Sequence, residues 1–327
     1  MKSKSHPFLL AAGVAGTLVA LFDASSALAQ GGAGRPIRVL VPVAPGGPSD
    51  TAVRLIAPKL GETLGRTLVV DNRASANGVA GTEIASKAVP DGNTLAIGNS
   101  GTHAINMTLY RKLPYDVLRD FVPISQIVTS GMVLVAHPKV PAASLTEFID
   151  LAKKEPGRIN IGVAGATGEI AGEALMARTQ TRLNNVRYKG SAPTELAVVS
   201  GEIAVTLLTP VASMQHIGSG RLKAFGITSA RRLPLLPQVP TIAELGVQGF
   251  DFQIWHGLFA PAKTPDAVVN LAHRGVVHAL ETPELRERFQ TLGFEVVGSS
   301  PQQFAAFVKS EIGKFRTVIR DANIQLE

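Results

Sequence analysis

Four loops of this chain are rich in glycine and in hydroxyl-bearing residues, which are residue types suited to anion binding. The first contains Gly46, Gly47, Ser49 and Asp50 and directly follows an apolar run. Two adjacent glycines let the backbone come close to a ligand, and the N-terminus of a following helix attracts negative charge. Asp50 is also a reasonable N-cap for that helix, so a plain tight turn and a binding loop are both open interpretations of this segment.

The other three loops offer hydroxyls, amides and one cation. Their candidate residues are Ser100, Thr102 and His103 in the second loop, Thr167 and Gly168 in the third, and Lys189 and Ser191 in the fourth. His103 has no acid or nucleophile near it in the sequence, which favours a structural role over catalysis. Lys189 can donate to an anion, or it can be an ordinary solvated charge.

The third loop comes close to a dinucleotide fingerprint without completing it. Gly162, Gly165 and Gly168 give the spacing G-x-x-G-x-x-G. A carboxylate about 20 residues later would bind the ribose, but the stretch 185–190 has none. The spacing therefore favours a backbone loop that receives an anion over a nucleotide site.

The composition limits the possible chemistry. The chain has no cysteine, which excludes disulfides and thiolate chemistry. Because no metal-ligating histidine spacing and no nucleophile elbow occur, we expect no catalytic residue, no metal site and no cofactor. The net charge of +7 favours an anionic partner, but the basic residues are scattered and only 5% of residues are aromatic. A small anionic solute therefore fits better than nucleic acid.

The N-terminal segment has the three regions of a secretory signal peptide. Lys2 and Lys4 precede the apolar run Phe8–Phe22, and Ala27-Leu28-Ala29 ends the segment. The run is too short to cross a hydrocarbon core, so a retained membrane anchor is disfavoured. We expect cleavage after Ala29 and an exported protein that is not embedded in a membrane.

Short apolar runs alternate with helical patterns from residue 36 onward. The predicted strands are Ile37–Val43, Leu68–Val70, Thr94–Ile97, Met132–Ala136, Ile159–Val163, Ile203–Leu208 and Leu222–Ile227. Helical periodicity occupies several intervening segments, with Asp50 and Ser144 as expected N-caps, and dominates the C-terminal quarter. This alternation predicts an α/β fold with mostly parallel sheets, arranged as two lobes with a cleft between them.

Several motifs keep one order and spacing along the whole mature chain. They are Pro36–Pro42 with Pro45–Asp50, Val70–Arg73, Thr102–Asn106, Tyr188–Gly190, Pro240–Glu244 and Trp255–Pro261. In these motifs the chain resembles Bug-type proteins, the extracytoplasmic solute-binding components of tripartite tricarboxylate transporters.

The resemblance implies a two-lobed periplasmic-binding-protein fold of type II-like architecture that closes over a carboxylate-bearing solute. Backbone N–H groups, hydroxyls and water would hold the carboxylate, with these contacts mapped onto the chain: Gly46, Gly47, Ser49, Asp50, Ser100, Thr102, Thr167, Gly168, Lys189, Ser191 and Thr209. Residues 1–29 would be the signal peptide, residues 30–136 and 251–327 lobe one, and residues 137–250 lobe two. The protein would be a periplasmic monomer without catalytic activity that delivers its ligand to membrane permease subunits. The alternatives are an exported α/β enzyme, such as a hydrolase or oxidoreductase, and a ligand sensor for a membrane signalling protein.

Two departures from the family pattern bear on the ligand. The loop Asn72–Gly78 has fewer glycines than the family stretch, and Leu208 stands where relatives commonly carry an acidic residue. Because leucine cannot pair with an ammonium group, the second departure suggests a ligand without an amino group. Trp255 is expected either to line the cleft or to pack in the core.

Overall fold

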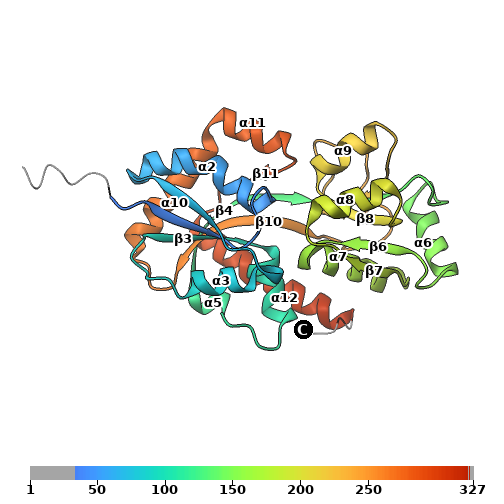
Figure 1. The fold of residues 1–327 in the computed structure, drawn as a ribbon, viewed down its shortest axis with the longest axis horizontal. Helices are drawn as coiled ribbons and strands as arrows, with labels where there is room; N and C mark the ends of the chain where they lie inside the picture. Colours follow the sequence, from blue (N-terminus) through green and yellow to red (C-terminus); the bar gives the residue numbers. More distant parts are fainter. Residues whose placement is uncertain (1–33, 323, 325–327) are drawn as a thin grey trace, which may run out of the picture.

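The computed structural model describes residues 34–322 and residue 324, and the predicted signal peptide lies outside them. Two β-sheets lie side by side along the longest axis of the molecule, each flanked by helices (Figure 1). The predicted two-lobed α/β architecture is confirmed.

The first sheet has six strands. In spatial order they are β11 (Glu295–Val296), β4 (Phe121–Gly131), β10 (Gln253–Pro261), β3 (Thr94–Asn99), β1 (Ile37–Val41) and β2 (Leu68–Asn72). Strands β2, β1 and β3 are parallel neighbours, whereas β10 and β4 run antiparallel to theirs.

The second sheet has five strands. In spatial order they are β7 (Asn184–Arg187), β6 (Asn160–Val163), β8 (Val205–Leu208), β5 (Val133–Ala136) and β9 (Lys223–Ile227). Strands β7, β6 and β8 are parallel, and β5 pairs antiparallel with both β8 and β9.

Helices cover both faces of each sheet because the strands are apolar on both sides. On one face of the first sheet, Ile56 and Leu60 of α2 (Pro48–Leu64) share a core with Val276 of α10 (Asp266–Glu281) and Phe289 of α11 (Pro283–Thr291). On its other face lie α3 (Val79–Ser86), α5 (Val117–Asp120) and α12 (Pro301–Asp321) (Figure 1). The π-helical turn η2 (Gly101–Ile105) and α4 (Asn106–Leu109) contact α12, and η1 (Ala76–Gly78) contacts η2.

The second sheet is covered in the same way. One face carries α6 (Leu145–Lys154) and α7 (Gly165–Thr179), and the other carries α8 (Ser191–Ser200) and α9 (Pro210–Gly218) (Figure 1). A single cluster of buried side chains includes Phe304 and Phe315 of α12 and Leu175 of α7, so the apolar core continues from one lobe into the other.

All seven predicted strands exist, but the prediction that the sheets are mostly parallel was wrong. Both sheets are mixed, because the chain passes between the lobes through strands that enter their sheets antiparallel to their neighbours. Strand β4 ends at Gly131 and β5 begins at Val133 in the other sheet. The segment Val133–Ala136, assigned to lobe one from the sequence, therefore pairs in the sheet of lobe two.

Within residues 34–322, no helix combines the length and the apolar character that a membrane span requires.

Candidate solute-binding site

The strand ends of the two lobes meet, and helices begin there. Strands β1 and β3 lead into α2 and η2, and strands β6, β7 and β8 lead into α7, α8 and α9. Because the strands within each of these groups are parallel, their carboxyl ends lie along one edge of each sheet. A hydrogen bond of 2.9 Å between the hydroxyls of Ser100 and Thr167 joins the two edges.

The first of these helices begins at Pro48, earlier than the sequence suggested. Proline suits the first helical position because it needs no N–H donor there, and Gly47 is the N-cap. The prediction that Asp50 is the N-cap was therefore wrong. Its carboxylate lies in the first turn and accepts the backbone N–H of Gly46 (2.9 Å), which holds the loop against the helix.

Asp50 is a buried anion whose oxygens are occupied by neighbouring groups of its own lobe. It accepts hydrogen bonds from Arg54 Nε (2.8 Å) and Asn72 Nδ2 (3.0 Å) as well as from Gly46. Burial alone would raise the pKa of this carboxyl, but the hydrogen bonds from Arg54, Gly46 and Asn72 outweigh it and the pKa is lowered. Asp50 thus shapes the loop, while the backbone N–H groups of Ser49 and Asp50 lie in the first turn, where they have no carbonyl of their own helix to bond.

The hydroxyl of Ser49 is buried in a small polar network. It accepts from Asn99 Nδ2 (3.2 Å) and lies 3.1 Å from His256 Nδ1. Asn99 ends β3, and His256 faces it from β10 in the same sheet. Neither Asn99 nor His256 was singled out from the sequence. Asn99 stood beside the predicted Ser100, whereas β10 was not predicted as a strand, so nothing along the chain connected His256 to Ser49.

The second loop turns its hydroxyls in different directions. Ser100 faces the other lobe through Thr167, as described above, whereas Thr102 lies 2.9 Å from His103 Nδ1 and receives the backbone N–H of Asn99 (3.2 Å). The His103 ring packs in tilted orientations against Phe259 and Phe121, with ring centroids 4.2 and 4.8 Å away. His103 is therefore a core residue, and Thr102 is mostly engaged within the loop.

In the second lobe the loops leave room beside the backbone. Gly165 has a positive φ of 72°, and a side chain at Gly165 or Gly168 would meet nothing within 4 Å. Thr209 is the half-buried N-cap of α9 and makes no side-chain capping bond. Lys189 and Ser191, by contrast, are exposed at the start of α8.

The two buried histidines near the site are neutral at physiological pH. Burial lowers the pKa of His103 to about 3 and that of His256 to about 4. The described part of the chain contains no group of three side chains suited to hold a metal ion. The charge available to an anion here comes mainly from backbone dipoles, with Lys189 at the margin.

Two residues discussed from the sequence belong to the core. Trp255 is fully buried, and its indole N–H donates to Glu311 Oε2 at 3.1 Å. Leu208 is 2% exposed and packs with Val133 and Val198. Its side chain thus points into the apolar core of lobe two and gives no support to the inference about a ligand ammonium, and a ligand without an amino group stays a prediction.

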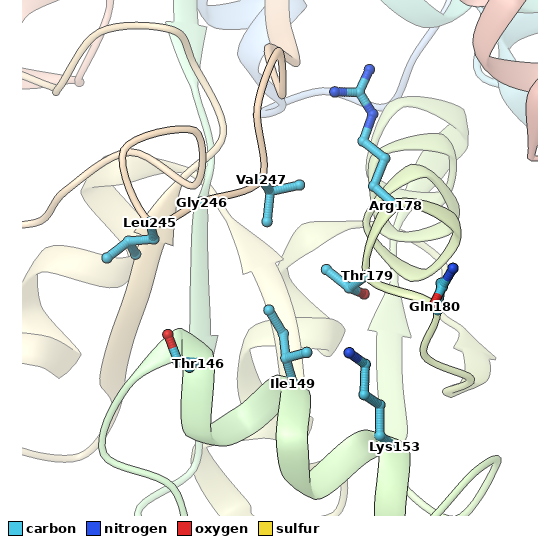
Figure 2. A pocket seen from close by; sticks show the side chains of 9 residues that line it. All are labelled: Thr146, Ile149, Lys153, Arg178, Thr179, Gln180, Leu245, Gly246 and Val247. Atoms are coloured by element: carbon cyan, nitrogen blue, oxygen red, sulfur yellow. The ribbon is translucent and has the colours of Figure 1, made fainter.

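A separate cavity of about 270 Å³ lies at the other end of α7 (Figure 2). It is lined by Thr146, Ile149, Lys153, Arg178, Thr179, Gln180, Leu245, Gly246 and Val247. Arg178 points away from the other lining side chains and donates to the carbonyl of Gln248 (2.7 Å). The 15 residues of α7 separate this cavity from the strand ends by about 20 Å, since a helix rises 1.5 Å per residue. The two places are distinct.

A two-lobed fold with loops and helix N-termini meeting at its strand ends defines a solute-binding protein. The model of the tripartite tricarboxylate transporter family receptor matches residues 52–324. The protein BugT of Bordetella pertussis is 34% identical over 296 residues, which cover 90% of this chain and 91% of BugT. The chain belongs to the tripartite tricarboxylate transporter receptor family.

Solved structures agree with this assignment. The structure of R. palustris Rpa4515 with adipate superposes with a TM-score of 0.83 at 31% identity, covering 89% of this chain and 98% of that one. MatC from Rhodopseudomonas palustris with bound malate gives a TM-score of 0.80 at 31% identity, and the match covers 87% of this chain and 98% of MatC. The periplasmic binding protein BugD gives a TM-score of 0.81, also at 31% identity, and the match covers 89% of this chain and 99% of BugD. The predicted periplasmic-binding-protein fold and the resemblance to Bug-type proteins are confirmed.

Proposed function

We propose that this protein is exported to the periplasm, binds a small organic carboxylate between its lobes and delivers it to the permease subunits of a tripartite transporter. The lobes would be divided at Met132 and between Ile227 and Gln253, where the chain changes sheets. The main support is that α2, α7, α8 and α9 all begin at strand ends that meet where the lobes meet. Each helix N-terminus carries free N–H groups and about half a positive charge, which suits an anion.

The composition of these loops supports a carboxylate held by the backbone. The proposed contacts are Gly46, Gly47, Ser49, Asp50, Ser100, Thr102, Thr167, Gly168, Lys189, Ser191 and Thr209, with Asp50 contributing its N–H. Arginine could hold a carboxylate with two parallel hydrogen bonds, but the proposed contacts include no arginine. Proteins with the same fold have solved structures with adipate and with bound malate, which supports a small di-acid as the ligand.

The site is proposed to bind without catalysis. A serine nucleophile needs a histidine base that is oriented by a third group. Ser49 does contact His256, but His256 Nε2 has no hydrogen-bond partner among the described residues, and no carboxylate orients the ring. The test is recovery: a carboxylate incubated with the protein and then released by denaturation should be chemically unchanged.

The binding function is tested with a panel of acetate, succinate, malate, adipate, citrate and benzoate. A ligand that binds only the folded protein raises its melting temperature, and titration calorimetry then gives the affinity. If no member of the panel shifts the melting temperature or gives a heat of binding, the carboxylate assignment fails.

Gly168 allows a sharper test, because stability and binding should move in opposite directions. Its Cβ would enter open space beside the third loop. Gly168→Ala should stabilise the helix by up to about 1 kcal/mol, because alanine has the higher helix propensity. The same methyl group would fill space meant for the ligand and weaken binding. The matched control is Gly313→Ala on α12, where a Cβ also meets nothing within 4 Å but where no ligand is expected. Unchanged affinity in Gly168→Ala would remove this loop from the site.

Delivery to a permease rests on the family assignment, and a monomeric state is part of the proposal. A role as a ligand sensor for a membrane signalling protein uses the same binding event. Deletion of the gene separates the two, since loss of carboxylate uptake supports transport, and retained uptake with a lost transcriptional response supports sensing.

A further inference from the structure

The Ser49 hydroxyl is held on one side by two polar groups of its own lobe. Asn99 Nδ2 lies 3.2 Å from Ser49 Oγ, and His256 Nδ1 lies 3.1 Å from it. Ser49 is 2% exposed and His256 is 4% exposed, so the protein itself fixes these contacts. A hydroxyl has one proton and two lone pairs, and its role toward a ligand depends on which of these the neighbours use.

The direction of the Asn99 bond is determined by a second contact. Asn99 Oδ1 accepts the backbone N–H of Thr102 at 3.0 Å. Because a backbone N–H can only donate, the amide cannot be flipped, and its NH2 group must face Ser49. Asn99 therefore uses one lone pair of the Ser49 oxygen.

The remaining question is which nitrogen of His256 carries the proton. Burial lowers the pKa of His256 to about 4, so the neutral ring has one N–H at physiological pH. His256 Nε2 has no hydrogen-bond partner among the described residues. The imidazole ring packs edge to face with Phe294, with the two ring centroids 5.7 Å apart. A proton on Nε2 would leave a buried N–H donor unpaired, which is the rarer and costlier defect in folded proteins. A proton on Nδ1 instead points at Ser49 Oγ.

We propose that His256 is a positioning residue that donates its Nδ1–H to Ser49, so that Ser49 presents its own proton to the bound carboxylate. Asn99 and His256 then occupy both lone pairs of the Ser49 oxygen, and the hydroxyl is left with donation as its remaining hydrogen bond. This inference rests on the proposed carboxylate function and assigns Ser49 a fixed role in it. It also gives the site selectivity for ligand groups that accept hydrogen bonds.

The tautomer of His256 is measured on the ligand-free protein. Two-bond 1H–15N correlation spectra distinguish a protonated ring nitrogen from a bare one, and the His256 signals are assigned by their loss in His256→Gln. We expect Nδ1 to be protonated and Nε2 to be bare at pH 7. A protonated Nε2 would overturn the proposal, whether or not the protein binds a carboxylate.

A double-mutant cycle tests whether His256 acts through Ser49. Ser49→Ala and His256→Phe should each weaken binding of the tightest member of the carboxylate panel by about ten- to hundredfold, as expected for one hydrogen bond to a charged group. If His256 acts through Ser49, the double variant should bind no more weakly than Ser49→Ala. Additive losses would mean that His256 supports the site in some other way and would contradict the proposal.

Two further variants keep the result interpretable. His256→Gln retains an amide donor and should bind more tightly than His256→Phe, which checks the bond even if phenylalanine disturbs the fold. His278→Gln on α10 changes an exposed histidine and should bind like the unmodified protein. If the unmodified protein binds no carboxylate at all, the proposed function fails, and the spectra still decide the tautomer on their own.

Discussion

The contact between Ser100 and Thr167 predicts that the two lobes can be locked together by a disulfide. Their hydroxyl oxygens are 2.9 Å apart across the lobes, and the chain has no cysteine to compete. In the double variant Ser100→Cys/Thr167→Cys the two sulfur atoms would lie close to bonding distance. We expect a disulfide to form under mild oxidation in the absence of ligand.

The size of the effect follows from the loop that the bond closes. The two positions are 67 residues apart. Chain-entropy loss in the unfolded state then stabilises the oxidised protein by about 4 kcal/mol as an upper value. For a domain pair of this size, that corresponds to a rise in melting temperature of roughly 7 °C. Locking should also prevent a ligand from entering between the lobes, so the oxidised form should bind carboxylates far more weakly than the reduced form.

The assay compares one protein in two redox states. Mobility on a non-reducing gel reports the bond, thermal melts with and without dithiothreitol report stability, and calorimetry in the same two states reports binding. The single cysteine variants are the controls, and they should respond to dithiothreitol in none of these measurements. Failure of the disulfide to form would show that the two loops do not meet in solution. A disulfide that leaves binding unchanged would refute ligand entry between the lobes.

Two other predictions concern the fold around the site. Gly257→Ala should destabilise the protein by about 1–3 kcal/mol, because the new Cβ would overlap the buried ring of Phe304, while Gly313→Ala should stabilise it. Denaturant titration measures the stability of both variants, and equal stabilities would contradict the packing argument. Asp50→Asn should lower the melting temperature at pH 7 and lose this effect at low pH. The pKa of Asp50 is lowered on folding, so its stabilisation is present above 3.8, the ordinary value, and disappears as the pH falls through the folded pKa. Melts from pH 7 to pH 2.5 check this against Asp150→Asn at an exposed position, and a difference from the unmodified protein that does not shrink with acid would refute it.

The elements that follow local rules could be predicted from the sequence. The strands Ile37–Val41 and Thr94–Asn99 are short, largely apolar runs. Helix α2 follows β1 and helix α7 follows β6, and glycines stand at both junctions. Ser144 was correctly expected as an N-cap, since its hydroxyl accepts the N–H of Glu147. Strand β10, in contrast, was missed, because only its antiparallel pairing with β3 and β4 makes it a strand.

The sequence by itself determined the class of the protein and the loops that could receive an anion. Those features depend on residue type at short range, such as two glycines before a helix or a hydroxyl after a strand. Only the tertiary structure decided which of these groups act together. It brought Ser100 against Thr167 and His256 against Ser49, and it turned Leu208 and Trp255 into the core. The physical reason is that partners 67 and 207 positions apart become neighbours only when the chain has crossed between the sheets, and no local pattern records that crossing.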